Sequence, residues 1–504
     1  MLELSRFLDR RSQNKKNKPD NNLKSVEALN YRVVNDQTTS LISNTSENLA
    51  IEQKHGFEET DEFKRAFALM ESDSQFIFIT GKAGTGKSTL IDYFRKYTEK
   101  NVAYLAPTGI AALHIGGKTI HSLFQFPPKI IRSETIEDNK YKSNIEKIFR
   151  ELDTLVIDEI SMTRVDLIDG IDYILKRYRD PNMPFGGVQM IFIGDLYQLQ
   201  PVVKDDGKTI TVKFKGFEYQ WNATEYFEYV YNGVFFFNAK SLKNVDYNYF
   251  ELTRNFRQND EKFINLLNSV RINEMNDMLF SILNKQCMTI ASNIANDTRI
   301  FLCTTNDTAK KINDKKLKDL KSQIYEYNAV MTGKFANQYK PVDYPVNEAL
   351  ELKEKAQVMM VKNDPKGRWV NGTIGTIEYL DNDRVDVKIG IFTYTMGLYT
   401  WEAIEYVFDY EKNKLVSKVA GTFTQYPIKL AWAITIHKSQ GQTFEKVAID
   451  LGNEAFAAGQ TYVALSRCKT LEGIILTRPV EQKDIKVDQK IVDFENRIKN
   501  SIPF

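Results

Sequence analysis

The sequence predicts an α/β protein with parallel sheets, divided into more than one domain. The length of 504 residues exceeds what a single core usually holds and fits about two to four domains. Short apolar runs, each typical of a buried strand, alternate with helical patterns along most of the chain. Between about 350 and 427 the pattern changes to short alternating segments separated by polar turns, which predicts a small all-β insertion.

The first predicted strand is FIFIT at 76–80, which follows an amphipathic helical pattern beginning at Asp61 and runs into a glycine loop. Apolar runs without alternation indicate strands that are covered on both faces, as in parallel sheets. The other runs of this kind are VAYLA at 102–106, TLVID at 154–158, VQMIFIG at 188–194, RIFLCTT at 299–305 and KVAIDL at 446–451.

Two segments do not follow this pattern. Residues 1–58 are polar, poor in aromatics and without apolar periodicity, which predicts a disordered tail. The stretch from 203 to 240 is rich in aromatics but has no clear period, so its structure is not predictable. It is either structural or a surface for DNA or a partner.

The composition excludes several classes of protein. Hydrophobic residues make up 42% and charged residues 27%, which is typical of globular proteins. The net charge of +2 predicts no global attraction to nucleic acid, so a DNA site would have to be a local groove. Three scattered cysteines and four histidines predict neither a disulfide framework nor a zinc or nuclease metal centre. No apolar run is long enough for a membrane span and no export signal is visible, so a cytoplasmic protein is expected.

A phosphate-binding loop follows the first predicted strand. Residues 81–88 read GKAGTGKS, a full match to GxxxxGK[ST], and they open a helical pattern, as this motif requires. Lys87 is expected to neutralise the β and γ phosphates, and the Ser88 hydroxyl is expected to bind Mg²⁺. The residues expected to bind the nucleotide here are Gly81, Gly84, Gly86, Lys87, Ser88 and Thr89.

Carboxylates and an amide follow two later strands. Asp158 and Glu159 end the strand TLVIDE, where ligands of α/β sheets bind. We expect Asp158 to bind Mg²⁺ and Glu159 to orient or activate the attacking water. Gln198 follows the strand that ends at Gly194, and a glutamine in this place can sense the γ-phosphate or position water.

Arginines far downstream decide between the classes of phosphate-loop enzyme. The segment ELTRNFRQ carries Arg254 and Arg257, and YVALSRCK carries Arg467. Arginines supplied across a cleft stabilise the transition state only when the cleft closes, which couples hydrolysis to domain motion. Each one taken singly is more typical of a surface ion pair.

These segments together resemble the Pif-one-like DNA helicases, in the Pif-one and RecD-like branch of superfamily 1B. The resemblance covers about residues 60 to 480 and places several long motifs in the family's order. Besides GKAGTGKS, the motifs are APTGIAALHIGGKTIHSLF (106–124), VIDEISM (156–162), NMPFGGVQMIFIGDLYQLQPV (182–202), LTRNFRQ (252–258), AWAITIHKSQGQTF (431–444) and YVALSRCK (462–469).

The resemblance implies two tandem RecA-like domains that sandwich ATP, with a small SH3-like all-β insertion in the second. The implied boundaries are 59–245 for the first domain, with a wedge or pin at about 119–145, and 246–349 with 428–485 for the second. The SH3-like subdomain would occupy 350–427, and a C-terminal helix or tail 486–504.

The family's functional residues carry over onto the matching motifs. Lys87, Asp158, Glu159, Gln198, Arg257 and Arg467 would be catalytic, Ser88 and Asp158 would bind Mg²⁺, and Gly441 and Gln442 would face the nucleotide. The residues implied to contact DNA are Thr108, Gly109, His121, Ser122, Trp369, Asn371, Thr435, His437, Lys438 and Ser439. For Trp369 and His121, burial in a core is the alternative. The family's adenine-reading glutamine has no counterpart at its usual place, because Gln53 is offset.

The implied function is an ATP- and Mg²⁺-dependent 5′ to 3′ DNA helicase that acts on single-stranded DNA and on junctions of single- and double-stranded DNA. Replication, recombination, repair or telomere maintenance would be its setting, in a cytoplasm of prokaryotic or phage-like type. The protein is expected to be a monomer, with replication or repair proteins as possible partners. Two alternatives stay open: a RecD-like ATPase subunit of a larger complex, and a phosphate-loop kinase or switch. The kinase or switch would not need the TIHS and IHKSQG motifs.

Overall fold

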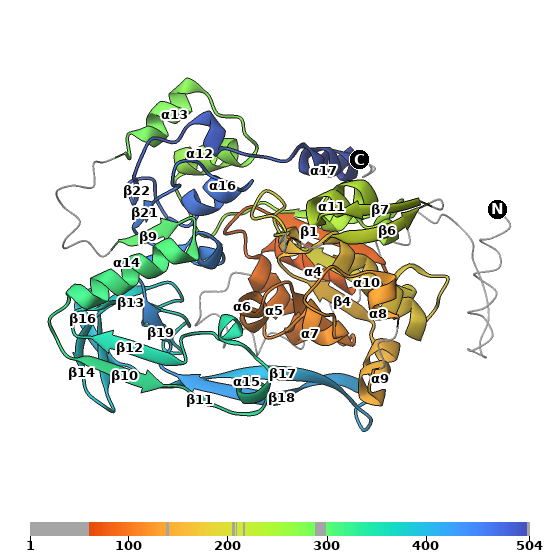
Figure 1. Ribbon diagram of the computed structural model, residues 1–504, viewed down its shortest axis with the longest axis horizontal. Coiled ribbons are helices and arrows are strands. Elements are labelled where there is room, and N and C mark those ends of the chain that lie inside the picture. Colours follow the sequence, from red (N-terminus) through yellow and green to blue (C-terminus); the bar gives the residue numbers. More distant parts are fainter. Residues whose placement is uncertain are drawn as a thin grey trace. The chain divides into compact units, whose positions relative to one another are not determined.

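The computed structural model describes residues 60–500, apart from 138–140, 204–206, 208, 215–216 and 288–298. The predicted tail at 1–58 lies outside the described residues. The described chain contains two parallel sheets and a group of antiparallel sheets (Figure 1). We call residues 60–252 the first region, 253–319 with 431–485 the second region, and 324–430 the β-rich region. The predicted α/β class with two parallel-sheet units is confirmed.

The first region is built on a parallel sheet of six strands in the order β3-β2-β4-β5-β1-β8. Four of the strands are buried along their whole length, which explains their uninterrupted apolar sequences. The strands are β1 (Phe76–Gly81), β2 (Val102–Ala106), β3 (Lys118–Thr119), β4 (Thr154–Ile157), β5 (Gln189–Ile193) and β8 (Asn248–Leu252).

Strand β8 corrects the expected boundary at 245. It pairs in parallel with β1, from Ile77 opposite Asn248 to Gly81 opposite Leu252, so the first region extends to Leu252. The segment after β8 therefore leaves the sheet beside the loop that follows β1. There the Phe256 amide donates to the Gly84 carbonyl over 2.9 Å.

Helices cover the first sheet, and the segment expected to be a wedge takes part in this cover. Phe124, Phe126 and Ile136, which lie within 119–145, are buried in the core of the first region. These three side chains are therefore structural, and the wedge or pin role of the segment stays a prediction. The helices are α4 (Asp61–Glu71), α5 (Lys87–Tyr97), α6 (Gly109–His114), α7 (Ile120–Phe124), α8 (Ser133–Ile136), α9 (Ser143–Glu151) and α10 (Val165–Tyr178).

The aromatic stretch at 203–240 forms an antiparallel hairpin, β6 (Ile210–Phe214) and β7 (Phe217–Trp221), followed by α11 (Ala223–Tyr231). Its last aromatics enter the core, where Phe237 stacks on Phe494 with ring centroids 4.1 Å apart. Phe494 belongs to the C-terminal helix α17 (Gln489–Asn500), which lies beside α11 in Figure 1. The buried aromatics of this stretch therefore have a structural role, which is one of the two alternatives expected for it.

The second region has a parallel sheet of four strands in the order β20-β9-β21-β22, with a separate apolar core. The long interval between β9 and β20 in the sequence is where the β-rich region is inserted. The elements are α12 (Glu261–Arg271), α13 (Asp277–Asn284), β9 (Ile300–Cys303), α14 (Asn306–Asp319), β20 (Ala433–Thr435), the 3-10 helix η9 (His437–Ser439), β21 (Val447–Ile449), α16 (Gln460–Leu465) and β22 (Ile474–Leu476).

The β-rich region begins at Ile324, earlier than the expected 350, because β10 pairs with β12 and β11 pairs with β18. Its five-stranded antiparallel sheet has the order β16-β15-β14-β13-β19, and its SH3-like class stays a prediction. The elements are β10 (Ile324–Asn328), β11 (Val330–Met331), α15 (Gly333–Asn337), β12 (Ala349–Lys353), β13 (Gln357–Met360), β14 (Ile374–Leu380), β15 (Val385–Ile389), β16 (Phe392–Thr395), β17 (Tyr399–Asp409), β18 (Lys414–Gln425) and β19 (Ile428–Leu430).

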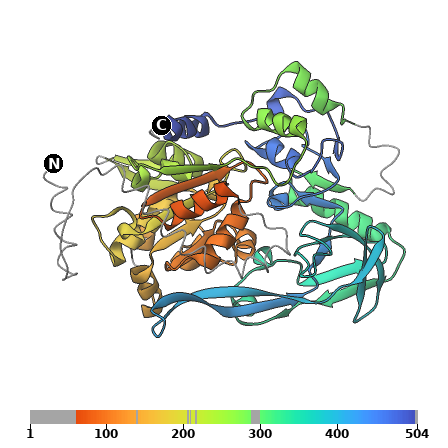
Figure 2. The ribbon, with the colours of Figure 1, turned by 180° about the vertical axis from the view of Figure 1, so that it is seen from behind.

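The long hairpin of β17 and β18 runs along the helices of the first region, as Figure 2 shows from behind. The Tyr104 amide of β2 donates to the Tyr406 hydroxyl over 2.9 Å, and both residues are buried. This contact joins segments about 300 residues apart in the sequence. In the described ranges, no helix combines the length and apolar character needed to cross a membrane.

Candidate active site and nucleic-acid interface

The loop between β1 and α5 has the form that its glycines predict. Gly84 has a φ of +88°, and a Cβ atom there would lie 2.6 Å from the Cβ of Arg257. A side chain at this position would therefore be strained and would also clash with the segment after β8. The loop leads into the N-terminus of α5, which favours a bound phosphate through its free amide groups and its dipole.

Lys87 lies over the loop. Its Nζ donates to the carbonyls of Gly81 at 2.7 Å and Lys82 at 3.1 Å. Burial lowers the pKa of Lys87, while the carboxylates of Asp195, Glu159 and Asp158 act in the opposite direction. The ammonium group thus lies among carboxylates, at the place where the motif puts the phosphates.

Asp158 and Glu159 lie together at the carboxyl end of β4. Asp158 is buried, and Glu159 takes the left-handed conformation with a φ of 49°. Burial raises the pKa of both carboxyl groups, and the charge of Glu159 adds to the effect on Asp158. Two neighbouring buried carboxylates are destabilised by each other, so the pair favours a bound cation.

Gln198 is held by the loop after β5. Its Nε2 donates to Asp195 Oδ2 over 3.2 Å, and its Oε1 accepts from the amide of Gln440 at 3.2 Å. The same Gln440 Nε2 donates to Glu159 Oε2 over 2.9 Å. One glutamine of the second region therefore contacts both residues that were expected to handle the attacking water.

Arg257 and Arg467 come from the segment after β8 and from the end of α16. Burial lowers the pKa of Arg257 to about 10 and, together with the charge of Arg257, that of Arg467 to about 9. Arg257 donates to the Ser466 carbonyl over 3.2 Å. Among the described residues, the Arg257 and Arg467 guanidiniums donate to carbonyl and hydroxyl groups. The two cations lie close enough for the charge of Arg257 to act on Arg467, an arrangement that favours a bound anion.

A cavity of about 430 Å³ brings most of the predicted nucleotide residues together. Both the phosphate loop and the two arginines contribute to its wall. Its lining consists of Ala83, Gly84, Thr85, Gly86, Lys87, Ser88, Thr89, Glu159, Gln198, Phe256, Arg257, Val370, Gly441, Thr443, Arg467 and Lys469. Gly81, Asp158 and Gln442 are absent from this lining, although Asp158 and Gln442 each adjoin a lining residue in the sequence. The Gly81 carbonyl accepts the hydrogen bond from Lys87 Nζ.

The donors at this site fit Mg²⁺ bound with phosphates. Ser88 is exposed at the start of α5, and the carboxylate of Asp158 lies close enough to Lys87 for the two to interact. Within the described part of the chain, no group of three or more His, Cys, Asp or Glu side chains could hold a metal ion. Mg²⁺ suits such a sparse site, because it typically takes one or two protein ligands and completes its shell with phosphates and water.

The first set of predicted DNA residues follows β2 and β3. The exposed Thr108 caps α6 by accepting from the Ala111 amide over 3.3 Å. A Cβ at Gly109 would lie 3.5 Å from Asp343 Oδ1, so the β-rich region reaches this loop. His121 and Ser122 lie half-buried on α7, and burial lowers the pKa of His121.

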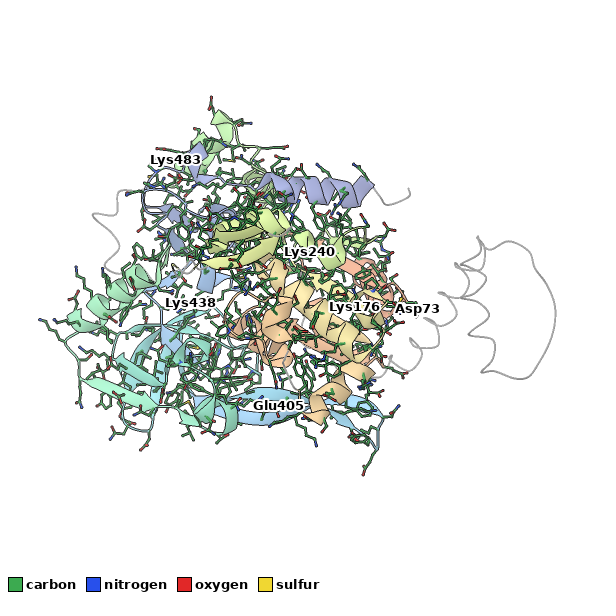
Figure 3. The ribbon with its side chains drawn as sticks, turned by 45° about the vertical axis from the view of Figure 1, so that its right-hand side comes forward. Asp73, Lys176, Lys240, Glu405, Lys438 and Lys483 are labelled. Carbon is green, nitrogen blue, oxygen red and sulfur yellow. The ribbon has the colours of Figure 1, made fainter. Side chains whose placement is uncertain are left out.

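The second set follows β20, at the carboxyl end of the other parallel sheet. Lys438 is exposed on η9 and is labelled in Figure 3. His437 is half-buried, and its ring stacks on Phe456. Thr435 and Ser439 are buried: the Thr435 hydroxyl accepts from the Lys438 amide, and the Ser439 hydroxyl donates to the Ile436 carbonyl. These two hydroxyls stabilise the turn that presents Lys438.

Trp369 does not fit the role expected of it. The Trp369 ring is 9% exposed and packs in the core of the β-rich region, with the Arg368 guanidinium 4.6 Å from its centroid and Tyr394 beside it. No open ring face is left for a base, so the core alternative is correct for Trp369. The Asn371 Oδ1 is buried without a hydrogen-bond partner among the described residues, and the DNA contact expected of Asn371 stays a prediction.

Four residues at the cleft were not predicted. Gln440 lies within the quoted HKSQGQ and Tyr462 within YVALSRCK, so their motifs could have indicated them. Tyr462 accepts from the Ala83 amide over 3.1 Å, and Gln258 donates to the Ser466 and Cys468 carbonyls. Arg271 on α12 pairs with Asp195 across 76 residues, and no local pattern marks it.

The place of the missing adenine-reading glutamine lies in α4. There Glu62 accepts hydrogen bonds from the Thr253 amide and hydroxyl, each over 2.8 Å. Phe63, the next residue, packs against Gly86 of the phosphate loop. The start of α4 therefore contacts both the segment after β8 and the phosphate loop.

The family model of PIF1-like helicases matches residues 48–292. The ATP-dependent DNA helicase Pif1 of Bdellovibrio bacteriovorus is 30% identical over 87% of this chain and 92% of its own length. The ATP-dependent DNA helicase PIF1 of Rattus norvegicus is 31% identical over 86% of this chain, and the chain spans 63% of that relative's length.

Solved structures show the same likeness. Pif1 from Bacteroides sp in complex with ADP-AlF4 is 35% identical, with a TM-score of 0.79 over 88% of this chain and 98% of that one. Pif1 helicase from Bacteroides with ADP-AlF3 and ssDNA covers the same shares at 35% identity, with a TM-score of 0.61. Both the sequence comparisons and the fold therefore lead to one conclusion: the chain belongs to the PIF1-like helicase family.

Proposed function

We propose that this protein is an ATP-hydrolysing DNA helicase that moves 5′ to 3′ along single-stranded DNA. The observation that carries the proposal is the cleft in which the phosphate loop, Glu159 and Gln198 of the first region face Arg257 and Arg467. Closure around ATP would bring the two arginines onto the γ-phosphate, and hydrolysis would allow the cleft to reopen.

Each residue has a chemical task in this proposal. Lys87 binds the β and γ phosphates, and Ser88 and Asp158 hold Mg²⁺, which neutralises phosphate charge when it is bound. Glu159 takes a proton from the attacking water while Gln198 orients it. Arg257 and Arg467 stabilise the charge that develops on the transferred phosphoryl group.

DNA would bind along the carboxyl ends of the two parallel sheets. Thr108, Gly109, His121 and Ser122 supply the contacts of the first region, and His437 and Lys438 those of the second. The similarity to a Bacteroides Pif1 crystallised with ssDNA supports this partner. The three cysteines are unpaired, which is consistent with a reducing compartment such as the cytoplasm.

The test measures ATPase rates with and without oligo-dT, and the unwinding of duplexes that carry a 5′ or a 3′ single-stranded tail. We expect ssDNA to stimulate hydrolysis and unwinding to start only from the 5′ tail. The Lys87→Ala variant should lower kcat about 10²–10³-fold, because it removes a fixed charge that stabilises the transition state. Lys96→Ala, on the exposed face of the same helix α5, is the matched control.

The other outcomes separate the alternatives. Hydrolysis that ignores DNA would contradict a motor and favour a kinase or switch. Stimulated hydrolysis with no unwinding by the chain alone would favour an ATPase subunit that needs a larger complex. Unwinding from the 3′ tail would contradict the proposed direction while keeping the motor.

A further inference from the structure

The Gln440 side chain joins the second region to the first at the residues proposed to carry out hydrolysis. Gln440 directly follows η9 in the second region, and its side-chain Nε2 donates to Glu159 Oε2 at 2.9 Å and to Gln198 Oε1 at 3.2 Å in the first. Its own Oε1 is buried and has no hydrogen-bond partner among the described residues. A buried, unpaired amide oxygen is costly, so this arrangement belongs to one state of a cleft that changes.

The two groups that Gln440 contacts are those proposed to handle the attacking water. Glu159 and Gln198 would each need an oxygen free to accept from that water. In the present arrangement one oxygen of each accepts from the Gln440 amide instead. The other end of the Gln198 side chain is also occupied, because its Nε2 donates to Asp195. Because both ends of the Gln198 amide and one of the two Glu159 oxygens are engaged, we expect hydrolysis to be slower in this state.

The turn that carries Gln440 is stiff and exposes a cation. The Ser439 hydroxyl donates to the Ile436 carbonyl at 2.7 Å, and the amides of Gln440 and Gln442 donate to the carbonyls of His437 and Ser439. Lys438, two positions before Gln440, is exposed on this turn. A phosphate drawn to Lys438 would move the turn as a unit, and a shift of about 1 Å is enough to break a hydrogen bond of this length.

We propose that Gln440 is a positioning residue that makes hydrolysis depend on DNA. Without DNA its amide holds Glu159 and Gln198 away from the water, and a DNA phosphate on η9 withdraws the amide and releases both groups. The inference rests on the proposed function and deepens it, because it assigns the coupling to one side chain. Couplings between sites typically change ligand affinity about 5- to 150-fold, and we take the lower end as the expected effect on the DNA-free rate.

The experiment compares Gln440→Ala and Gln440→Leu with the wild type by steady-state ATPase, with and without saturating oligo-dT. Both variants should raise the DNA-free kcat at least about fivefold and leave the stimulated kcat within about twofold. The KM for ATP and the affinity for labelled oligo-dT, measured by fluorescence anisotropy, should stay unchanged. Gln440→Leu keeps the side-chain volume. A rate change caused by lost packing would therefore occur in the alanine variant and not in the leucine variant.

Gln482→Ala is the matched control. The exposed Gln482 amide donates to Asn273, and neither residue lines the cleft. It should change neither rate. Equal losses of the DNA-free and stimulated rates in the Gln440 variants would assign a merely structural role and overturn the coupling, as would an unchanged ratio. A wild-type rate that ignores oligo-dT would instead overturn the proposed function, and the coupling with it.

Discussion

Replacing Arg257 by alanine should lower the DNA-stimulated ATPase kcat by about 10³–10⁵-fold, the effect that arginine fingers have in related chemistry. The Arg257 side chain lines the cavity beside the phosphate loop, and its Cβ lies too close to Gly84 for any side chain there. Burial lowers the pKa of Arg257 only to about 10, so the guanidinium keeps its charge at neutral pH. Once the cleft has closed around ATP, this fixed charge would need no further reorganisation as the transition state forms.

Steady-state kinetics at saturating oligo-dT measures this effect. The KM for ATP should change much less than kcat, because the arginine acts mainly on the transition state. Arg257→Lys keeps the charge but loses the planar fork, so we expect it to recover only part of the rate. Arg177→Ala, an exposed arginine on α10 that donates to the Glu137 carbonyl, is the control. A loss smaller than about tenfold in Arg257→Ala would exclude Arg257 as the finger.

Replacing Arg271 by alanine should destabilise the protein by about 3–5 kcal/mol, the usual cost of leaving one member of a buried ion pair alone. Arg271 is 5% exposed and Asp195 is 0% exposed. The Arg271 guanidinium donates twice to Asp195 Oδ1, at 3.0 and 3.2 Å, and lies 4.0 Å from the ring centroid of Tyr197. Without the guanidinium, a charged carboxylate would stay buried beside Gln198.

The loss should depend on pH in a defined direction. Burial alone would raise the pKa of Asp195, but Arg271 and Lys87 outweigh it and hold that pKa below its ordinary value of about 3.9. A carboxyl group with a lowered folded pKa contributes stability above its ordinary pKa and loses it as the pH falls through the folded pKa. The difference between wild type and Arg271→Ala should therefore be largest near pH 7 and shrink below about pH 4.

Chemical denaturation followed by circular dichroism at several pH values measures the difference. Lys483→Ala removes an exposed ion pair with Glu481, and Figure 3 labels its position; its denaturation midpoint should stay close to that of the wild type. The double variant Arg271→Ala, Asp195→Asn should recover part of the stability, because no buried charge remains. A midpoint of Arg271→Ala equal to that of the wild type would contradict a stabilising pair.

Local sequence was enough for the elements that hold the nucleotide. The strand FIFIT, the glycine loop and the helix from Lys87 are specified by neighbouring residues: continuous apolar side chains, a left-handed Gly86 and the amide groups of a helix start. The same holds for Asp158 and Glu159 after β4. Because strands of a parallel sheet present their carboxyl ends on one edge, the motifs also predicted that these residues would meet.

The roles of several other residues depended on distant parts of the chain. From the sequence, Trp369 could equally be a core residue or stack on a base. In the structure, Tyr394 and Arg368 cover its ring. The β8 strand looks like the start of a new domain until its pairing with β1 is known. The aromatic stretch before β8 has no period, because the partner of Phe237 is a helix more than 250 residues later.

What the sequence by itself determined is therefore the chemistry of the nucleotide site and the class of its sheets, because both arise from residues adjacent in the chain. What only the tertiary structure decided is how the two regions touch: Arg271 on Asp195, and Gln440 on Glu159 and Gln198. These contacts join residues 76 to 281 positions apart. Periodicity and capping act within a few residues, whereas such pairs form only when packing brings separate elements together.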